Sequence, residues 1–485
     1  MLHGDSEVHF SDTSPTTIAQ GEIRLSAQNN SGYRVENPTT GDILERFDTA
    51  TDEQIAHAVE AADRAHREWA ARSMRERSDI IHRVADLFEE RKQELADIIA
   101  REMGKPIPEG IEEAEFAAAI FRYYATNGEN FAADQTIDTA DGNQAVIRRL
   151  PIGPLLGIMP WNFPYYQIAR FAGPNLMLGN TILLKHADIC PTSALAVEKI
   201  LADAGAPTGV YTNIFASHDQ IADIIADPRI QGVSLTGSER AGSVVGAQAG
   251  KHLKKSVLEL GGSDPYVILD TDDVVAAAEL AWNTRMYNGG QACNSNKRLI
   301  VMDDVYEEFV DKLVELAGDM TPGTPQEAGG SVYSALSSRS AAERLHEQVQ
   351  HAVSEGAQLL VGGELGEAAY FSPAVLTDIT PEMDSHHVEF FGPVAVVYRA
   401  SSEEEALEIA NDTPFGLGGA VFSQDQDRAE SFAAHMEVGM ANVNTPAGEG
   451  ADIPFGGVKR SGYGRELGPL GMDEFVNKQM YYVRR

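Results

Sequence analysis

The chain has 485 residues, of which 38 are basic and 73 acidic, so its formal net charge at pH 7 is −35. This length is typical of two or three domains, and 43% apolar with 23% charged residues excludes a fibrous or wholly disordered protein. A chain this acidic repels phosphate backbones and anionic lipid, so we expect neither nucleic acid nor membrane among its partners.

The residues before position 151 are predicted to be mainly helical. Thr51-Asp-Glu-Gln54 has the pattern of a capping box that opens a helix, and apolar residues follow it near helical spacing. Further helices are predicted over residues 76–103 and 110–130. The alternation of residues 144–150 instead predicts a strand.

From residue 151 onwards, short apolar runs alternate with amphipathic helices such as residues 192–204. The runs cover residues 155–159, 181–184, 210–214 and 232–235. Strands separated by helices of ~10–15 residues indicate βαβ units and a parallel sheet covered on both faces. A second α/β stretch follows residue 262, with strands predicted over residues 266–269, 298–301 and 419–422 and a helix over residues 403–411.

The chain ends in an apolar, strand-like tail, Met480-Tyr-Tyr-Val483. This tail and residues 144–150 are both predicted to be edge strands. An exposed apolar edge tends to find a partner, so we expect the chain to assemble with further copies of itself.

The cellular location can also be predicted. The start of the chain lacks the basic and apolar stretches of a secretory signal, and no run approaches the ~18 apolar residues of a membrane span. We therefore expect a cytoplasmic protein. Only 11 of the 38 basic residues are lysine. Many carboxylates with few lysines suit a cytoplasm of high salt, which screens their repulsion, and an ordinary acidic bacterial enzyme is the alternative.

Cys293 is a candidate nucleophile. It lies in Asn288-Gly-Gly-Gln-Ala-Cys293, where two glycines allow close approach of a ligand and expose the sulfur. A small buried hydrophobic residue is an equally good interpretation of this cysteine taken alone, and it suits Cys190 well. Two cysteines are too few for a disulfide framework or a cysteine-built metal site.

Glu259 and Asn162 are candidates for acid–base and oxyanion chemistry. Glu259 lies between two leucines and precedes two glycines, where burial would raise its pKa toward that of a general base. Asn162 lies in Pro160-Trp-Asn-Phe-Pro164, whose prolines stiffen the backbone around an amide that can donate to a developing oxyanion. The alternative role of Glu259 is to cap a turn at the end of a strand. The alternative for the segment around Asn162 is a plain rigid loop.

Two segments are candidates for binding a dinucleotide. Thr236-Gly-Ser-Glu-Arg-Ala-Gly242 follows an apolar run and leads into a helix, whose N-terminus could hold a pyrophosphate. It departs from G-x-G-x-x-G, so an ordinary strand-to-helix turn is the alternative. Lys185 and Asp188 follow the apolar run of residues 181–184, at the carboxyl end of a predicted strand, where parallel sheets bind their ligands. The alternative is a solvated pair on the surface.

Read together, the motifs resemble those of the NAD(P)-dependent aldehyde dehydrogenase superfamily, from about Asn37 to the C-terminus. The motifs are Pro160-Trp-Asn-Phe-Pro, Leu184-Lys-His-Ala-Asp, Leu235-Thr-Gly-Ser, Leu258-Glu-Leu-Gly-Gly-Ser-Asp-Pro265, Gly-Gln-Ala-Cys293, Glu389-Phe-Phe-Gly-Pro-Val394 and Pro454-Phe-Gly-Gly-Val-Lys-Arg-Ser-Gly462. Their shared order and spacing make a chance coincidence negligible.

The resemblance implies an α/β, aldehyde dehydrogenase-like fold. Residues 31–130 and 151–259 would form a Rossmann-type, parallel-sheet cofactor-binding domain, and residues 260–440 an α/β catalytic domain. A small β element for oligomerisation would comprise residues 131–150 and 466–485, and residues 441–465 would form a substrate and catalytic loop region. In the resembled family such strands join subunits, which implies a homodimer or homotetramer.

The resemblance also implies the roles of the site residues. Cys293 would attack the carbon of a small-molecule aldehyde, the Asn162 amide and the Cys293 N–H would hold the oxyanion, and Glu259 would activate the water that hydrolyses the thioester. Lys185 and Asp188 would contact the adenosine ribose of NAD(P), and Glu389 the nicotinamide ribose. The implied cofactor-binding residues are Trp161, Lys185, Asp188, Gly237, Ser238, Gly242, Leu260, Glu389 and Phe391.

No metal is implied. The pair His386-His387, just before Glu389, invites a metal hypothesis, but adjacent histidines seldom converge on one ion. Residues 321–338 match the family poorly.

Within the superfamily the chain is most similar to succinate-semialdehyde dehydrogenases. Arg170 matches an arginine that grips the distal carboxylate of the substrate, and its alternative role is an ion pair with a surface acid. A second arginine of some relatives is Tyr287 here, and Glu449 and Asp452 would repel a carboxylate that they faced. The semialdehyde of 2-oxoglutarate and a broad range of aliphatic aldehydes are therefore alternative substrates.

Asp188 bears on the choice between NAD and NADP. Its carboxylate can accept a hydrogen bond from the ribose 2′-OH and would repel a 2′-phosphate, which favours NAD. Aspartate is shorter than the glutamate found in many members, and Lys185 tolerates either cofactor, so NADP stays possible.

Two other classes of function are a coenzyme A-acylating dehydrogenase, which would not need Glu259, and a non-catalytic binding relative, which would not need the three catalytic residues together.

Overall fold

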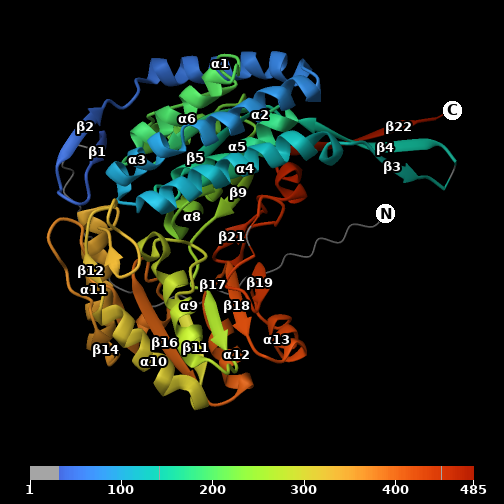
Figure 1. Cartoon of the computed structure of the whole chain (residues 1–485). Coiled ribbons are helices and arrows are strands. Elements are labelled where there is room, and N and C mark those ends of the chain that lie inside the picture. The colour runs from blue at the N-terminus through green and yellow to red at the C-terminus, as the bar shows by residue number, and fades with distance from the viewer. Residues whose placement is uncertain (1–31, 141, 449, 485) are drawn as a thin grey trace, which may run out of the picture. The chain divides into compact units, whose positions relative to one another are not determined.

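The computed structural model describes residues 32–140, 142–448 and 450–484 (Figure 1). The described chain begins with a hairpin of β1 (Tyr33–Glu36) and β2 (Ile43–Phe47), followed by helices α1 (Asp52–Ala71), α2 (Met74–Glu90), α3 (Lys92–Met103) and α4 (Ile107–Phe131). The predicted capping box is confirmed: the Thr51 hydroxyl accepts from the Gln54 N–H, and the Gln54 side chain accepts from the Thr51 N–H.

The prediction of a single helix over residues 76–103 is wrong in one respect. The backbone leaves the helical region at Arg91 (φ −108°, ψ 8°), which separates α2 from α3. No glycine or proline marks this break in the sequence, so the apolar spacing alone could not show it.

The first large sheet has the strand order β21-β9-β8-β5-β6-β7. Its parallel strands are β5 (Pro154–Met159), β6 (Thr181–His186), β7 (Tyr211–Asn213), β8 (Gly232–Thr236) and β9 (Lys255–Glu259), joined by α5 (Pro164–Leu178), α6 (Pro191–Asp203), α7 (His218–Ala226) and α8 (Glu239–Lys251). The predicted βαβ units are confirmed. The two-residue β21 (Gly462–Tyr463) pairs antiparallel with β9, so a distant segment lies beside Glu259.

The second large sheet has the order β14-β15-β16-β11-β10-β18-β19. Its strands are β10 (Pro265–Ile268), β11 (Arg298–Met302), β14 (Gln358–Val361), β15 (Ala374–Thr377), β16 (Val394–Ala400), β18 (Gly418–Phe422) and β19 (Met440–Val443). Its helices are α9 (Val274–Met286), α10 (Asp303–Gly318), α11 (Arg339–Glu355), α12 (Glu403–Asn411) and α13 (Gln426–Ala433). All neighbours are parallel except β14 and β15.

Short elements complete the connections of this half. They are the two-stranded pairs β12 (Thr321–Pro322) with β13 (Val332–Tyr333) and β17 (Phe415–Gly416) with β20 (Val458–Lys459), and the 3-10 turns η1 (Tyr287–Gly290), η2 (Asp384–His387) and η3 (Pro469–Asp473).

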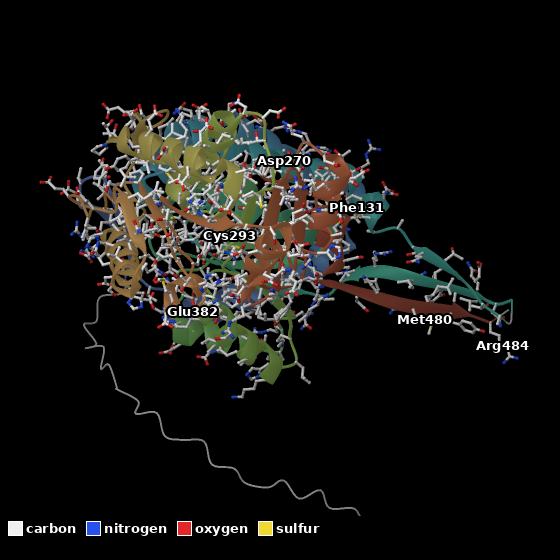
Figure 2. The ribbon with its side chains drawn as sticks, turned by 90° about the horizontal axis from the view of Figure 1, so that it is seen from below. Phe131, Asp270, Cys293, Glu382, Met480 and Arg484 are labelled. Carbon is white, nitrogen blue, oxygen red and sulfur yellow. The ribbon has the colours of Figure 1, made fainter. Side chains whose placement is uncertain are left out.

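A third sheet, of β3 (Gln135–Asp138), β4 (Gln144–Pro151) and β22 (Val476–Val483), extends away from the two large sheets (Figure 1). The prediction that residues 144–150 form an edge strand is wrong, because β4 lies between β3 and β22. Its second partner comes from more than 300 residues away, which local alternation cannot reveal. The prediction for the tail is confirmed: β22 is an outer strand, and Met480 lies far out along it (Figure 2).

No helix among the described residues is long and apolar enough to cross a membrane.

Candidate active site

The predicted catalytic residues come from the connections around the two large sheets. Asn162 lies between β5 and α5, and Glu259 is the last residue of β9. Cys293, labelled in Figure 2, lies between η1 and β11 of the second sheet. The chain passes from the first sheet to the second between Glu259 and Pro265, so the site lies where the two sheets meet.

The turn before Cys293 has a left-handed backbone. Asn288, Gly289 and Gly290 have φ values of 52°, 59° and 72°. A Cβ at Gly290 would collide with the Gly392 carbonyl, so this position requires glycine. The glycines of the motif therefore form the turn that presents Cys293, which is partly exposed, whereas Cys190 is fully buried.

The surroundings of the Cys293 sulfur favour the thiol over the thiolate. Burial raises the pKa of Cys293 to about 11, and the nearby Arg170 and Lys297 cations oppose that rise. Cys190 is held in its thiol form even more firmly, because burial raises its pKa well above the ordinary value. Of the two sulfurs, only Cys293 has both access to solvent and cationic neighbours.

Asn162 lies in a buried network of amides. Its Nδ2 donates to the Gln291 carbonyl at 2.9 Å, and its Oδ1 accepts from Gln167 Nε2 at 3.0 Å. Its own carbonyl accepts from Asn288 Nδ2 at 2.9 Å. The Pro-Trp-Asn-Phe-Pro loop is thus hydrogen-bonded directly to residues 288–293, which form the cysteine turn.

Glu259 is a buried carboxyl group, only 2% exposed. Neither of its oxygens has a hydrogen-bond partner among the described residues. Burial raises the pKa of Glu259 well above its ordinary range, Arg170 opposes this effect and Glu466 adds to it. The predicted environment of a general base is therefore present.

Arg170 reaches the site already paired. It forms a buried ion pair with Glu466, and its Nη2 and Nη1 donate to Thr236 Oγ1 (3.2 Å) and Tyr166 OH (3.3 Å). Its guanidinium also lies 4.4 Å from the centre of the Phe455 ring. The pairing acid is thus a buried residue rather than a surface one.

Of the two acids that were expected to bear on substrate choice, Asp452 lies in the loop after β19 and is exposed to solvent. Glu449 lies outside the described residues. Tyr287, at the position of the second arginine, stacks on the Phe163 ring with the centroids 6.1 Å apart. A cavity of about 330 Å³, lined in part by Asn294 and Phe455, lies beside the cysteine turn.

The predicted dinucleotide segment forms the turn between β8 and α8. Ser238 caps α8, its hydroxyl accepting from the Ala241 N–H at 3.3 Å. A Cβ at Gly237 would meet only a Leu235 methyl at 3.7 Å, so its backbone is open to a ligand. Gly242 instead packs on Leu260, with no room for a side chain. A helix N-terminus behind an open backbone fits a pyrophosphate.

The two predicted ribose ligands at β6 form an ion pair. Lys185 Nζ lies 2.6 Å from Asp188 Oδ1, and the Asp188 side chain is 40% exposed while that of Lys185 is buried. The charge of Asp188 is therefore partly neutralised before any cofactor binds. This arrangement tolerates a 2′-phosphate better than an unpaired carboxylate would.

Lys297 is a functional candidate that sequence reasoning missed. Its buried ammonium donates to the Ala292 and Cys293 carbonyls, both at 2.7 Å, and lies 3.1 Å from Glu389 Oε1. Glu389 also accepts from the Gly262 N–H at 3.2 Å. One cation thus joins the cysteine turn to the residue expected at the nicotinamide ribose. A charged residue four positions after Cys293, just before a buried strand, is a signal that could have revealed it.

The aromatic residues expected near the nicotinamide also lie together. The Trp161 and Phe391 rings meet edge to face, with centroids 5.7 Å apart. Glu466 and Gln167 are two further residues of the site that the sequence did not single out, because their partners lie on other elements. Glu466 stands in the loop after β21 and Gln167 on α5.

The two adjacent histidines have ring nitrogens close to one acidic side chain. Ligand atoms of His386, His387 and Asp412 lie within 4.8 Å of one another. His386 Nε2 is already 3.1 Å from Asp412 Oδ2, and burial lowers the pKa of His386. Because a lowered pKa favours the neutral imidazole, a hydrogen bond between His386 and Asp412 accounts for this grouping, and the absence of a metal stays a prediction.

Comparison with known proteins identifies relatives over nearly the whole chain. The sequence profile of the Aldehyde dehydrogenase family matches residues 25–481. The Succinate-semialdehyde dehydrogenase (NADP(+)) of Deinococcus radiodurans is 48% identical over 459 residues, which cover 94% of this chain and 96% of that protein. A succinate semialdehyde dehydrogenase (NAD(P)+) of Escherichia coli K12 is 38% identical over 452 residues, covering 93% and 97%.

Solved structures agree. The succinic semialdehyde dehydrogenase of Streptococcus pyogenes, in complex with NADP+, matches with a TM-score of 0.91 at 39% identity and covers 93% of this chain and 100% of that chain. The predicted α/β, aldehyde dehydrogenase-like fold is therefore confirmed.

Alkylation of Cys293 tests its electrostatic surroundings. Because its pKa is raised to about 11, the rate with iodoacetamide should rise about tenfold per pH unit between pH 7 and 10. Lys297→Met removes a stabilising cation, so the profile should shift to higher pH and the rate at pH 8 should fall at least about threefold. Lys297→Arg, which keeps the charge, is the control. An unchanged profile in Lys297→Met would contradict this account.

Proposed function

Because the chain belongs to the aldehyde dehydrogenase family, we propose that it oxidises succinate semialdehyde to succinate, with NAD(P)+ as the oxidant and a thioester on Cys293 as the intermediate. The family makes the chain an NAD(P)-dependent oxidoreductase. The observation that carries the mechanism is the buried carboxyl of Glu259, which has no hydrogen-bond partner in the described part of the chain, at the same site as a partly exposed Cys293. The names of the relatives support the substrate.

The first half-reaction forms the thioester. The partly exposed Cys293 thiol loses its proton to solvent, the resulting thiolate attacks the aldehyde carbon, and the carbonyl electrons move to the oxygen. The second Nδ2 hydrogen of Asn162 and the Cys293 N–H would stabilise that oxyanion. This carbon would then lose a hydride, for which the nicotinamide of a bound NAD(P)+ would supply the acceptor.

The second half-reaction hydrolyses the thioester. Glu259 takes a proton from water, which attacks the acyl carbon, and the Cys293 sulfur leaves as a thiolate. A carboxylate without hydrogen-bond partners is free to receive that proton. Its raised pKa makes it a stronger base once deprotonated, so hydrolysis should accelerate as the pH rises through that raised pKa.

The residues around both candidate ribose sites and the start of α8 fit NAD(P). Gly237 and Ser238 would face the pyrophosphate, Lys185 and Asp188 the adenosine ribose, and Glu389 the nicotinamide ribose. Trp161 and Phe391 would flank the nicotinamide. Leu260 would line its pocket, and Gly242, which was predicted to approach the pyrophosphate, packs on Leu260.

Arg170 is our candidate for recognition of the distal carboxylate. Its ion pair with Glu466 offsets its charge, so the carboxylate would compete with or share a partner already in place. This supports weaker selection than an unpaired arginine would give. The semialdehyde of 2-oxoglutarate and simple aliphatic aldehydes therefore belong in the same substrate panel.

The assembly and the salt response are further parts of the proposal. Met480 and Tyr481 are 64% and 45% exposed on the outer strand β22, so this sheet is suited to pairing with another copy. The net charge of −35 is suited to high salt, since its self-repulsion extends over ~30 Å at 0.01 M ionic strength but only ~3 Å at 1 M. A cytoplasmic location stays a prediction from the sequence.

Substitution of Glu259 separates the two half-reactions. Glu259→Gln should give a burst of NAD(P)H of one equivalent per site and then turn over at least about a hundredfold more slowly, because no base activates water. Cys293→Ala should give no burst. The assay is stopped-flow absorbance with and without coenzyme A. Wild-type turnover by Glu259→Gln, or wild-type release that needs coenzyme A, would refute the hydrolytic mechanism.

Substrate discrimination tests Arg170. The measured quantity is the ratio of kcat/KM for succinate semialdehyde to that for butanal, which lacks the carboxylate. In Arg170→Gln/Glu466→Gln, which removes both charges of the buried pair, this ratio should fall about tenfold or more. Glu466→Gln alone leaves Arg170 charged and should keep the ratio or increase it. An undiminished ratio in the double variant would exclude Arg170 as the carboxylate ligand.

Cofactor preference tests Asp188. We expect the wild type to use both cofactors, because Lys185 partly neutralises the Asp188 carboxylate. Asp188→Ser should increase kcat/KM for NADP relative to NAD about tenfold, since it removes a charge that repels the 2′-phosphate. Asp188→Asn, which keeps the size, should act in the same direction. A cofactor ratio that both substitutions leave unchanged would show that Asp188 is not the selector.

Sedimentation measures the assembly. In 2 M KCl the wild type should sediment with at least twice the chain mass of 52.4 kDa, and Met480→Glu/Tyr481→Glu should shift it toward a single chain. The thermal midpoint of the wild type should rise between 0.1 and 2 M KCl. A single-chain mass at high salt argues against the assembly, and a falling midpoint argues against the adaptation to salt.

A further inference from the structure

A buried chain of three amide and carbonyl groups ends at the cysteine turn. Asn162 Nδ2 donates to the Gln291 carbonyl at 2.9 Å, and Gln167 Nε2 donates to Asn162 Oδ1 at 3.0 Å. Asn162 is 4% exposed and Gln167 is 1% exposed, so water does not compete for these bonds. Gln167 lies on α5, three residues after Pro164, where the helix fixes its backbone.

The orientation of the amides in this hydrogen-bond network is determined by the Gln291 backbone carbonyl at its end. A carbonyl can only accept, so the Gln291 carbonyl requires that Asn162 present its NH2 group on that side. The Asn162 oxygen then points toward Gln167, which must donate to it. One of the two Asn162 Nδ2 hydrogens is used by Gln291, and the other is left for the oxyanion of the proposed reaction.

Gln167 itself is not fully satisfied. Its Oε1 is buried and has no hydrogen-bond partner among the residues that the structure describes. A buried carbonyl without a partner lowers stability, so packing alone would favour an apolar residue of the same size here. The donor end of Gln167 is the part with a defined partner, and that partner is Asn162.

We propose that Gln167 is a positioning residue, which donates to Asn162 Oδ1 and thereby holds the Asn162 amide with its NH2 group toward the oxyanion. This inference rests on the proposed function. Without Gln167, the Asn162 oxygen would be buried without a donor. Its amide could then turn and present oxygen, which repels an oxyanion, in place of N–H.

The test compares Gln167→Met with Asn162→Ala and with the double variant. Asn162→Ala removes one oxyanion donor and should lower the rate of the NAD(P)H burst about a hundredfold. Gln167→Met should lower that rate about tenfold with KM changed less than twofold, and it should cause no further loss in the Asn162→Ala background. Its thermal midpoint and the rate of Cys293 alkylation should equal those of the wild type or exceed them.

A second variant covers the case in which Gln167→Met does not fold. Gln167→Glu has the same shape, donates when protonated and only accepts when ionised. The ratio of its burst rate to that of the wild type should therefore fall as the pH rises from 6 to 9, which a purely structural role would not produce.

The outcomes distinguish this inference from the proposed function. Three results would overturn the role of Gln167 alone. They are a wild-type burst rate in Gln167→Met, an equal loss of burst rate on adding Gln167→Met to the wild type and to Asn162→Ala, and a burst-rate ratio in Gln167→Glu that does not change with pH. A wild-type burst in Asn162→Ala would overturn the oxyanion role of Asn162 and this inference with it. No NAD(P)H from any aldehyde with the wild type would overturn the proposed function itself.

Discussion

The chemistry of this molecule depends on removing ionisable groups from water at the junction of its two large sheets. A buried charge is tolerated only when it is paired, and two such pairs exist at the site: Arg170 with Glu466, and Lys297 with Glu389. Glu259 and Cys293 have no direct ionic partner among the described residues, and burial raises the pKa of both. Glu259 is thus available for proton transfer and Cys293 for nucleophilic attack, each held by paired neighbours.

The fold supplies these groups from the ends of its strands. Glu259 ends β9 beside β21, and Cys293 stands before β11, whose neighbour β16 begins just after Glu389. Lys297 then joins the cysteine turn to Glu389, so the Cys293 backbone carbonyl and the expected cofactor ligand share one ammonium group. A displacement of either sheet would alter both at once. This coupling gives a physical reason for building the site at the sheet junction rather than within one domain.

The sequence predicted much of this arrangement because its signals are local. The capping box at Thr51, the βαβ alternation and the rigid loop around Asn162 each depend on residues within a few positions of one another. The break at Arg91 and the central place of β4 were missed, because packing and a strand from the other end of the chain determine them. Lys297, Glu466 and Gln167 were missed for the same reason. Their importance follows from partners that only the folded chain brings within reach.

The central claim is that a succinyl thioester forms on Cys293 and that Glu259 is needed to hydrolyse it. Mass spectrometry of Glu259→Gln, acid-quenched after one turnover with succinate semialdehyde and NAD(P)+, tests both halves of that claim. We predict one added succinyl group per chain on the peptide that contains Cys293, present in the variant and nearly absent from the wild type. NAD(P)H formation without that adduct, or an adduct on any other residue, would contradict the account.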